Sequence, residues 1–241
     1  MARRRFFVDR IHDNRAELTG DDARHLARVL RAEPGQRYEI SDNQRAYLAE
    51  IAAITGQRVT FAIVEALPAP PPAPEIILYA ALIKFDRFEW LIEKATELGV
   101  SRVLPVNAER TEKGLASAAT KRIERWRKIA RESSQQSRRL RMPDIAPVEP
   151  FADAIITTTV PYRFFLDEQP GAPPLLASLL ASRLESAAIL TGPEGGWTDR
   201  ERVAALNAGW KAVSLGANIL RAESAAIAAI ALVSQALSIA S

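Results

Sequence analysis

Five of the seven residues from Pro68 to Pro74 are prolines, and this run divides the chain into two parts. Proline lacks a backbone N–H and has a fixed φ, so the run can continue neither a helix nor a central strand. It favours an extended, semi-rigid connection. We therefore predict a linker at 68–74, an N-terminal domain at 1–67 and a C-terminal domain at 75–241.

The N-terminal part consists mostly of short β-prone runs. Turn signals such as Pro34-Gly35 and Thr55-Gly56 separate these runs. We predict strands at 6–8, 37–40, 46–51 and 58–64, and a helix at about 21–30. Short strands at this spacing favour a small β-barrel. Such barrels commonly present a face that binds nucleic acid, although a fold alone does not establish a function.

The C-terminal part alternates between apolar strands and helices. We predict strands at 76–83, 102–106, 163–166, 187–191 and 212–215. We predict helices at 86–98, where Asp86 is the expected cap, and at 120–138, 175–184, 199–208 and 223–239. Thr198 and Glu201 have the spacing of a capping box for the fourth of these helices. The alternation favours an α/β domain whose parallel sheet is covered by helices on both faces.

The last predicted helix is apolar on all sides, so we expect it to pack both on the sheet and against a second subunit. Ser224, Ser234 and Gln235 interrupt this apolar run, and we therefore predict no membrane span. No apolar segment of signal-peptide length follows the arginines of the N-terminus. These features favour a soluble cytoplasmic protein.

The chain contains no cysteine and only two histidines. The absence of cysteine excludes disulfides, thiol catalysis and cysteine-ligated metals. No cluster of acidic residues suggests another kind of metal site, so we expect no metal.

Basic residues are concentrated between Lys121 and Arg141, where nine Lys and Arg residues face two acids. This local excess is larger than the net charge of +3 for the whole chain. Such a patch suits a polyanion. The segment is equally compatible with the solvated face of a helix.

Two segments near the C-terminus carry the clearest chemical signals, and each follows a predicted strand. The first, Leu190–Trp197, contains three glycines that allow a ligand to approach the main chain. Ligands of open α/β sheets bind at such strand ends. An ordinary glycine-rich turn is the alternative. The second segment, Leu215–Ala225, places Arg221 and Glu223 between an apolar loop and an apolar helix. Their burial implies either a function or a structural Arg–Glu pair.

Both segments resemble the signature of the RsmE family, the small-subunit rRNA uridine-N3 methyltransferases of the SPOUT class. The resemblance extends over nearly the whole chain, and the order and spacing of its motifs make it specific. Its other motifs are Arg5–Val8, His25–Arg31, Lys84 with Glu89 and Lys94–Val100, Glu109-Arg110, and Glu132 with Gln136–Arg138. The chain departs from the family pattern in three positions, with Asn218 for arginine, Ser224 for threonine and Gln135 for glutamate.

The resemblance implies a PUA-like RNA-binding barrel followed by a SPOUT domain with a deep C-terminal trefoil knot. It also implies a homodimer that binds S-adenosylmethionine in the knot and acts on 16S rRNA or the small ribosomal subunit. The cofactor-binding residues that it implies are Leu190, Thr191, Gly192, Gly195, Gly196, Leu215, Gly216, Ile219, Leu220 and Ser224.

Methylation of uracil N3 removes a proton and leaves negative charge on the imide, which a nearby cation stabilises. We predict that Arg221 is this cation and that Glu194 or Glu223 accepts the proton or orients Arg221. Phosphate contacts are predicted for Arg5, Arg31, Arg138 and Arg139. The alternatives are a SPOUT methyltransferase acting on another RNA position and a catalytically silent, RNA-binding ribosome assembly factor.

Overall fold

The computed structural model describes residues 4–8, 10–69, 71, 74–158, 160–181 and 185–240. The chain forms two compact units. One consists of Met1–Pro72 together with Arg131–Met142, and the other of Ala73–Ala130 together with Pro143–Ser241. The N-terminal unit therefore includes a segment that the proline-rich boundary does not predict. Part of the proline run itself, residues 70, 72 and 73, lies outside the described residues.

The N-terminal unit contains a six-stranded sheet in the order β1-β4-β5-β6-β3-β2. Its strands are β1 (Arg5–Phe7), β2 (Ile11–His12), β3 (Arg15–Thr19), β4 (Arg37–Ser41), β5 (Ala46–Thr55) and β6 (Arg58–Ala66). The four predicted strands are present. Strands β2 and β3 were not predicted, because they are short and contain few apolar residues. The predicted helix at 21–30 is α1 (Gly20–Arg24) continued by a π-helical turn at His25–Val29.

The segment Arg131–Met142 is attached to this unit by polar contacts. Asp22 accepts hydrogen bonds from Arg131 Nε at 2.7 Å and from Gln135 Nε2 at 2.9 Å. The hydroxyl of Ser41 donates to the main-chain oxygen of Leu140 at 2.7 Å. A glutamate side chain at 135 could not donate to Asp22, so the glutamine at this position suits the observed contact.

The C-terminal unit contains a seven-stranded sheet in which every described pairing is parallel. Its main order is β10-β8-β7-β12-β11-β13, and β9 pairs with β8. The strands are β7 (Glu75–Ala81), β8 (Arg102–Asn107), β9 (Asp144–Ile145), β10 (Glu149–Pro150), β11 (Tyr162–Leu166), β12 (Ser186–Thr191) and β13 (Lys211–Val213). The five predicted strands are all present, which confirms the predicted parallel α/β architecture.

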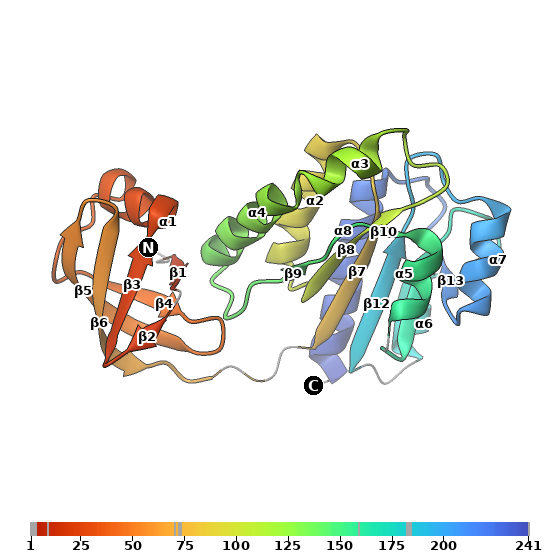
Figure 1. The fold of residues 1–241 in the computed structure, drawn as a ribbon. Coiled ribbons are helices and arrows are strands. Elements are labelled where there is room, and N and C mark those ends of the chain that lie inside the picture. Colours follow the sequence, from red (N-terminus) through yellow and green to blue (C-terminus); the bar gives the residue numbers. More distant parts are fainter. Residues whose placement is uncertain are drawn as a thin grey trace. The chain divides into compact units, whose positions relative to one another are not determined.

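Helices cover both faces of this sheet, as predicted. They are α2 (Phe85–Glu97), α3 (Leu115–Thr120), α4 (Ile123–Gln136), α5 (Phe151–Thr157), α6 (Leu175–Leu180), α7 (Asp199–Asn207) and α8 (Ala222–Ala240). Alternate residues of β7 point to opposite faces. Ile76 and Leu78 pack in the core with α2 and α8, whereas Ile77 and Tyr79 pack in the core with α5 and α7. Figure 1 shows α5 in front of the sheet and α8 behind it.

The predicted helix ends are correct for α7 and partly wrong for α2. Thr198 and Glu201 form the reciprocal capping box of α7, and Gly209, with φ +83°, follows its C-terminus. Helix α2 begins one residue before Asp86, which therefore lies in the first turn and does not cap the helix. A carboxylate in that first turn still interacts favourably with the helix dipole.

Helix α8 is long and apolar enough to cross a membrane by length and composition alone, and it is the only such helix among the residues that the structure describes. The core helix of a globular protein meets the same test. Ala226, Ile230 and Val233 of α8 are buried in the core that also contains residues of β7, β12 and α2. The opposite side of α8 is more open, and Ile239 near its end is 82% exposed. The expected all-round burial is therefore not achieved within one copy of the chain.

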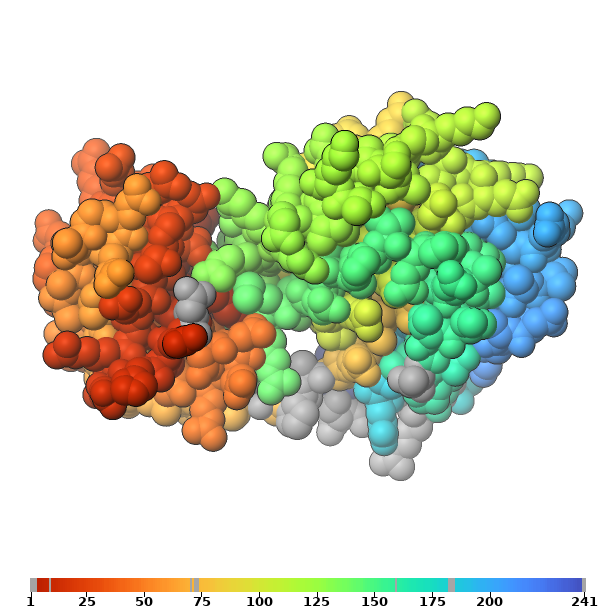
Figure 2. Space-filling view, in the orientation of Figure 1, coloured from red at the N-terminus to blue at the C-terminus, as the bar shows by residue number. Residues whose placement is uncertain are grey.

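The predicted basic helix at 120–138 is α4 (Ile123–Gln136), and a short helix that was not predicted, α3 (Leu115–Thr120), precedes it. Figure 2 shows residues 115–130, in light green, at the surface of the C-terminal unit. Arg122 and Arg125 bind the carboxylate of Glu89 on α2, with distances of 3.0 and 2.7 Å to Oε1. Part of the basic charge is therefore paired with an acid of the same unit, although the side chains of Arg122 and Arg125 remain 41% and 63% exposed.

These contacts make the stability of the C-terminal unit depend on pH. The hydrogen bond from Arg125, opposed by burial and reinforced by Arg122, lowers the pKa of Glu89 from its usual 4.5. A lowered pKa contributes stability that is present above the unfolded-state pKa and is lost as the pH falls through the folded-state pKa. We expect Glu89→Gln to reduce the free energy of unfolding at pH 7 by roughly 1–2 kcal/mol. Urea unfolding of both proteins at pH 7 and pH 3 checks this, because the difference should shrink at pH 3.

Candidate cofactor and active site

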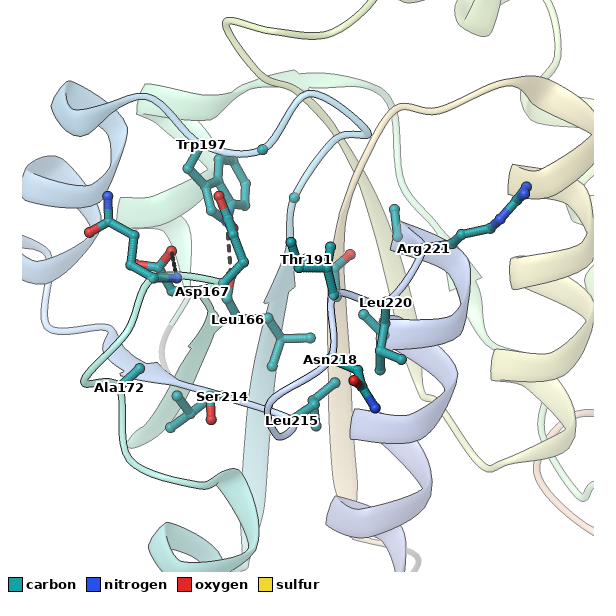
Figure 3. Close-up of a pocket in the computed structure, with 18 of the residues that line it drawn as sticks. Leu166, Asp167, Ala172, Thr191, Trp197, Ser214, Leu215, Asn218, Leu220 and Arg221 are labelled. Atoms are coloured by element: carbon teal, nitrogen blue, oxygen red, sulfur yellow. Dashed lines mark hydrogen bonds between the residues drawn. The ribbon is translucent and has the colours of Figure 1, made fainter.

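A cavity of the C-terminal unit has a volume of about 770 Å³ and lies at the carboxyl ends of three parallel strands. The segments that line it, 166–172, 191–197 and 213–222, follow β11, β12 and β13. Ligands of open α/β sheets bind at this edge, and the volume is typical of a site for a small molecule. Figure 3 shows Thr191, Leu215, Asn218 and Leu220 around this cavity.

Eight of the ten predicted cofactor-binding residues line the cavity, and two do not. Those in the lining are Thr191, Gly192, Gly195, Gly196, Leu215, Gly216, Ile219 and Leu220. Leu190 is fully buried in the core between the sheet and α7, because its side chain points to the other side of β12. Ser224 is exposed on α8 and is not in the lining. The structure thus brings the two predicted segments together but not these two side chains.

Trp197 holds the glycine-rich segment against the end of β11. Its ring is fully buried, and its Nε1 donates to the main-chain oxygen of Leu166 at 3.0 Å. A Cβ atom at Gly192 would lie 3.0 Å from this ring. A side chain at 192 would therefore press on the buried ring of Trp197, and glycine avoids this tight contact.

Arg110, from the loop after β8, supports the other side of the segment. Its Nη1 donates to the main-chain oxygens of Gly195 at 3.0 Å and Trp197 at 3.2 Å. These bonds satisfy two carbonyl groups of a turn that has no ladder partner. The segment is thus fixed from two directions before any ligand binds.

Arg202 of α7 connects the glycine-rich segment to an acidic part of the cavity wall. It donates to Asp167 at 3.1 Å, to Glu168 at 2.8 Å and to the main-chain oxygen of Trp197 at 2.8 Å. Burial alone would lower the pKa of Arg202, but the hydrogen bond and charge of Asp167 and the charge of Glu168 raise it. The guanidinium is therefore permanently charged and holds both carboxylates in place.

The three predicted catalytic residues lie near one another, but their pairing differs from the expectation. Arg87 at the start of α2 hydrogen bonds to Glu194. Arg87 Nε also lies 3.8 Å from Glu223 Oε1. Glu223 therefore pairs with Arg87 and not with Arg221, because α2 brings a guanidinium closer to it.

Arg221 lines the cavity and is exposed. It forms no ion pair with any residue that the structure describes. In Figure 3 its side chain extends away from Thr191. Arg221 is thus free to meet a ligand or substrate at this edge of the cavity.

The four predicted phosphate-binding arginines all belong to the N-terminal unit. Arg5 and Arg138 both bind the carboxylate of Glu39, and Arg5 also donates to the main-chain oxygen of Arg138 at 2.9 Å. Arg31 is exposed and has φ +50°. Arg139 donates to the main-chain oxygen of Arg141, and burial lowers its pKa to about 10. Arg31 is therefore the one of the four for which the described residues show no hydrogen bond or ion pair.

Sequence reasoning missed Arg87, Arg110, Arg202 and the pair Asp167-Glu168 as parts of the site. Asp167 and Glu168 follow the predicted strand at 163–166, so the rule that places ligands at strand ends could have found them. Arg110 was noticed only as part of a motif, and no local signal connects Arg202 with Asp167, which is 35 residues away.

Two families of known domains match this chain. The RNA methyltransferase domain family matches residues 70–234, and the RNA methyltransferase PUA domain family matches residues 18–64. The ribosomal RNA small subunit methyltransferase E of Synechocystis is 35% identical over 222 residues, which cover 89% of this chain and 71% of the relative. The protein of the same name from Mycobacterium bovis is 30% identical, and the match covers 93% of this chain and 88% of the relative.

A solved structure extends the similarity to the fold. The crystal structure of a ribosomal RNA small subunit methyltransferase E from Neisseria gonorrhoeae, bound to S-adenosyl methionine, has a TM-score of 0.83 and 27% identity. The match covers 95% of each chain. With these matches over nearly its whole length, this chain belongs to the family of ribosomal RNA small subunit methyltransferases E.

Proposed function

We propose that this protein transfers the methyl group of S-adenosylmethionine to N3 of a specific uridine in 16S ribosomal RNA. The observation that carries the proposal is the cavity at the ends of β11, β12 and β13, which a glycine-rich segment and Arg221 both line. The names of the relatives and the cofactor in the gonococcal structure support the same reaction.

The lining of the cavity suits S-adenosylmethionine. Leu166, Val213 and Leu215 offer apolar surface for an adenine ring, while Gly216 leaves its main-chain groups open to polar atoms. A Cβ at Gly216 would meet nothing within 4 Å, so the main chain there is freely approachable. The main chain of 191–196 and 215–220 would hold the nucleoside. When bound, the cofactor supplies an electrophilic methyl group on a sulfonium.

Arg221 and one of two carboxylates are the groups that we assign to the uridine. N3 lies on the Watson–Crick edge and carries a proton, so the base must be unpaired. The N3–H bond breaks, and the proton passes to Glu194 or Glu223. The N3 electron pair forms the bond to the methyl group, whose bond to sulfur breaks with its pair retained by sulfur. Arg221 stabilises the negative charge of the imide.

The N-terminal unit, as a PUA-like domain, would bind the RNA around the target uridine. We assign phosphate contacts to Arg31 and, when their present bonds are exchanged, to Arg5, Arg138 and Arg139. The domain bounds that we propose are 1–67 and 75–241, joined by the linker 68–74. A cytoplasmic location fits a substrate that belongs to the ribosome.

We further propose a deep trefoil knot in the C-terminal segment and a homodimer. The close approach of the segments 191–197 and 213–222 around one cavity supports the knot. The exposure of Ile219, at 85%, and Ile239, at 82%, supports a second subunit beside α8. Light scattering coupled to size-exclusion chromatography tests the dimer, and a mass of 26.5 kDa would refute it.

Mass spectrometry of nucleosides from 16S rRNA tests the reaction. Cells that lack the gene should lose N3-methyluridine from one site, and the purified protein with S-adenosylmethionine should restore it. Loss of a different methylated nucleoside would instead identify a methyltransferase acting on another RNA position. A protein that does not bind S-adenosylmethionine in calorimetry would be an RNA-binding assembly factor.

A further inference from the structure

Three charged side chains from separate elements meet at one edge of the cavity. They are Arg87 on α2, Glu194 in the glycine-rich segment and Glu223 in the first turn of α8, and we call them the Arg87 cluster. The proposed function leaves open which of the two carboxylates meets the uridine. In this cluster the two carboxylates differ in how accessible they are from the cavity.

Glu194 is accessible from the cavity. It belongs to the lining, and its side chain is 38% exposed. Arg87 Nη1 hydrogen bonds to Glu194 Oε1. Glu194 Oε2 forms no hydrogen bond that the structure describes, so this oxygen can accept one from a substrate.

Glu223 is not accessible in the same way. It is absent from the lining, and its side chain is only 9% exposed. Its Oε2 is buried without a hydrogen-bond partner. A uracil ring cannot reach this oxygen without moving the residues that cover it. The distance of 3.8 Å from Glu223 Oε1 to Arg87 Nε is too long for a hydrogen bond but keeps the opposite charges together.

Arg87 connects these two environments. It lines the cavity, and its side chain is 31% exposed. When an arginine lies between a buried and an accessible carboxylate, the orientation of its guanidinium group is fixed. A buried negative charge needs a nearby cation, so Glu223 retains Arg87 and Arg87 in turn retains Glu194.

We propose that Glu194 is the carboxylate that accepts the N3 proton, that Arg87 is the positioning residue that aims it, and that Glu223 is the buried countercharge that fixes Arg87. This assignment rests on the proposed function. It gives the two acids different roles, and substitution of each by its neutral isostere therefore gives different results.

The test compares Glu194→Gln with Glu223→Gln in the full-length enzyme on rRNA that lacks the modification. A general base contributes roughly 100- to 10,000-fold, so Glu194→Gln should lower kcat by at least about 100-fold. Glu223→Gln should lower kcat by less than about tenfold, because Arg87 keeps its bond to Glu194. The Kd for S-adenosylmethionine, from calorimetry, should change less than about threefold in both variants. An equal loss of kcat in both, or a larger loss in Glu223→Gln, overturns the assignment.

A second comparison tests Arg87 itself. Arg87→Met should lower kcat nearly as much as Glu194→Gln, and Arg87→Lys should recover at least about a tenth of the wild-type kcat because an ammonium can still pair with Glu194. Arg200→Met, an exposed arginine of α7 outside the cavity lining, is the matched control and should behave like the wild type. If Arg87→Lys is as inactive as Arg87→Met, Arg87 is not a positioning residue. If the wild type itself transfers no methyl group, the proposed function fails and this assignment fails with it. An active wild type combined with either contrary pattern of variants overturns the assignment alone.

Discussion

Gly196→Ala is expected to weaken binding of S-adenosylmethionine roughly 10- to 100-fold, because local strain of about 1–3 kcal/mol must be relieved inside the cavity wall. Gly196 has φ +68°, a conformation that L side chains rarely adopt. A Cβ there would lie 2.7 Å from Glu168 Oε1. Glu168 cannot easily move away, since Arg202 holds the same oxygen at 2.8 Å.

The matched control for this variant is Gly209→Ala. Gly209 also has positive φ, at +83°, but it follows α7 and lies outside the cavity lining. A Cβ at 209 would meet only Arg163 Nη1 at 3.6 Å, an ordinary contact. Both variants should lose a similar amount of thermal stability through the backbone, and only Gly196→Ala should raise the Kd in calorimetry. Equal Kd values for the two variants would show that the glycine-rich segment does not form the cofactor site.

Arg221→Ala should lower kcat by roughly 100- to 1,000-fold, the effect of removing one group that stabilises developing negative charge. The Kd for S-adenosylmethionine should stay within about threefold of the wild-type value. The reason is that Arg221 is exposed and forms no ion pair with the described residues, so its removal leaves no buried charge behind. Single-turnover methylation of unmodified rRNA measures the first quantity, and calorimetry measures the second.

Arg200→Ala serves as the control for Arg221→Ala, because it removes the same exposed charge from α7 outside the cavity. Loss of activity in both variants would indicate a general electrostatic effect on RNA binding. Wild-type turnover by Arg221→Ala would remove this residue from the mechanism. A large rise in Kd would instead make Arg221 a cofactor-binding residue.

The sequence predicted the strands and helices of the C-terminal unit better than it predicted which side chains contact one another. Continuous apolar runs mark the buried strands, and the capping box at Thr198 and Glu201 marks the start of α7. These signals depend only on residues close together in the sequence, so they can be recognised without knowledge of the fold. The short elements β9, β10 and α5 were missed because two or a few residues carry no periodicity.

For several predicted site residues, the side-chain direction, exposure or ion pairing in the structure differs from what the sequence suggests. Leu190 lies in the right strand but points to the face covered by α7, since neighbouring strand residues alternate between faces. Ser224 lies on an exposed part of α8. Arg5 and Arg138, which look like free cations in the sequence, share the carboxylate of Glu39.

The amino-acid order by itself determined which segments are strands and helices, and it placed both predicted ligand-binding segments at strand ends, because hydrophobic periodicity and turn chemistry act over a few residues. Only the tertiary structure decided which charges meet. Arg87 reaches Glu194 because β7 and β12 are neighbours in the sheet although they are far apart in the chain. Arg87 and Glu223, and Arg202 and Asp167, are also separated in sequence and meet only in the folded unit. Electrostatic pairing depends on distance in space, and the order of strands in the sheet sets that distance.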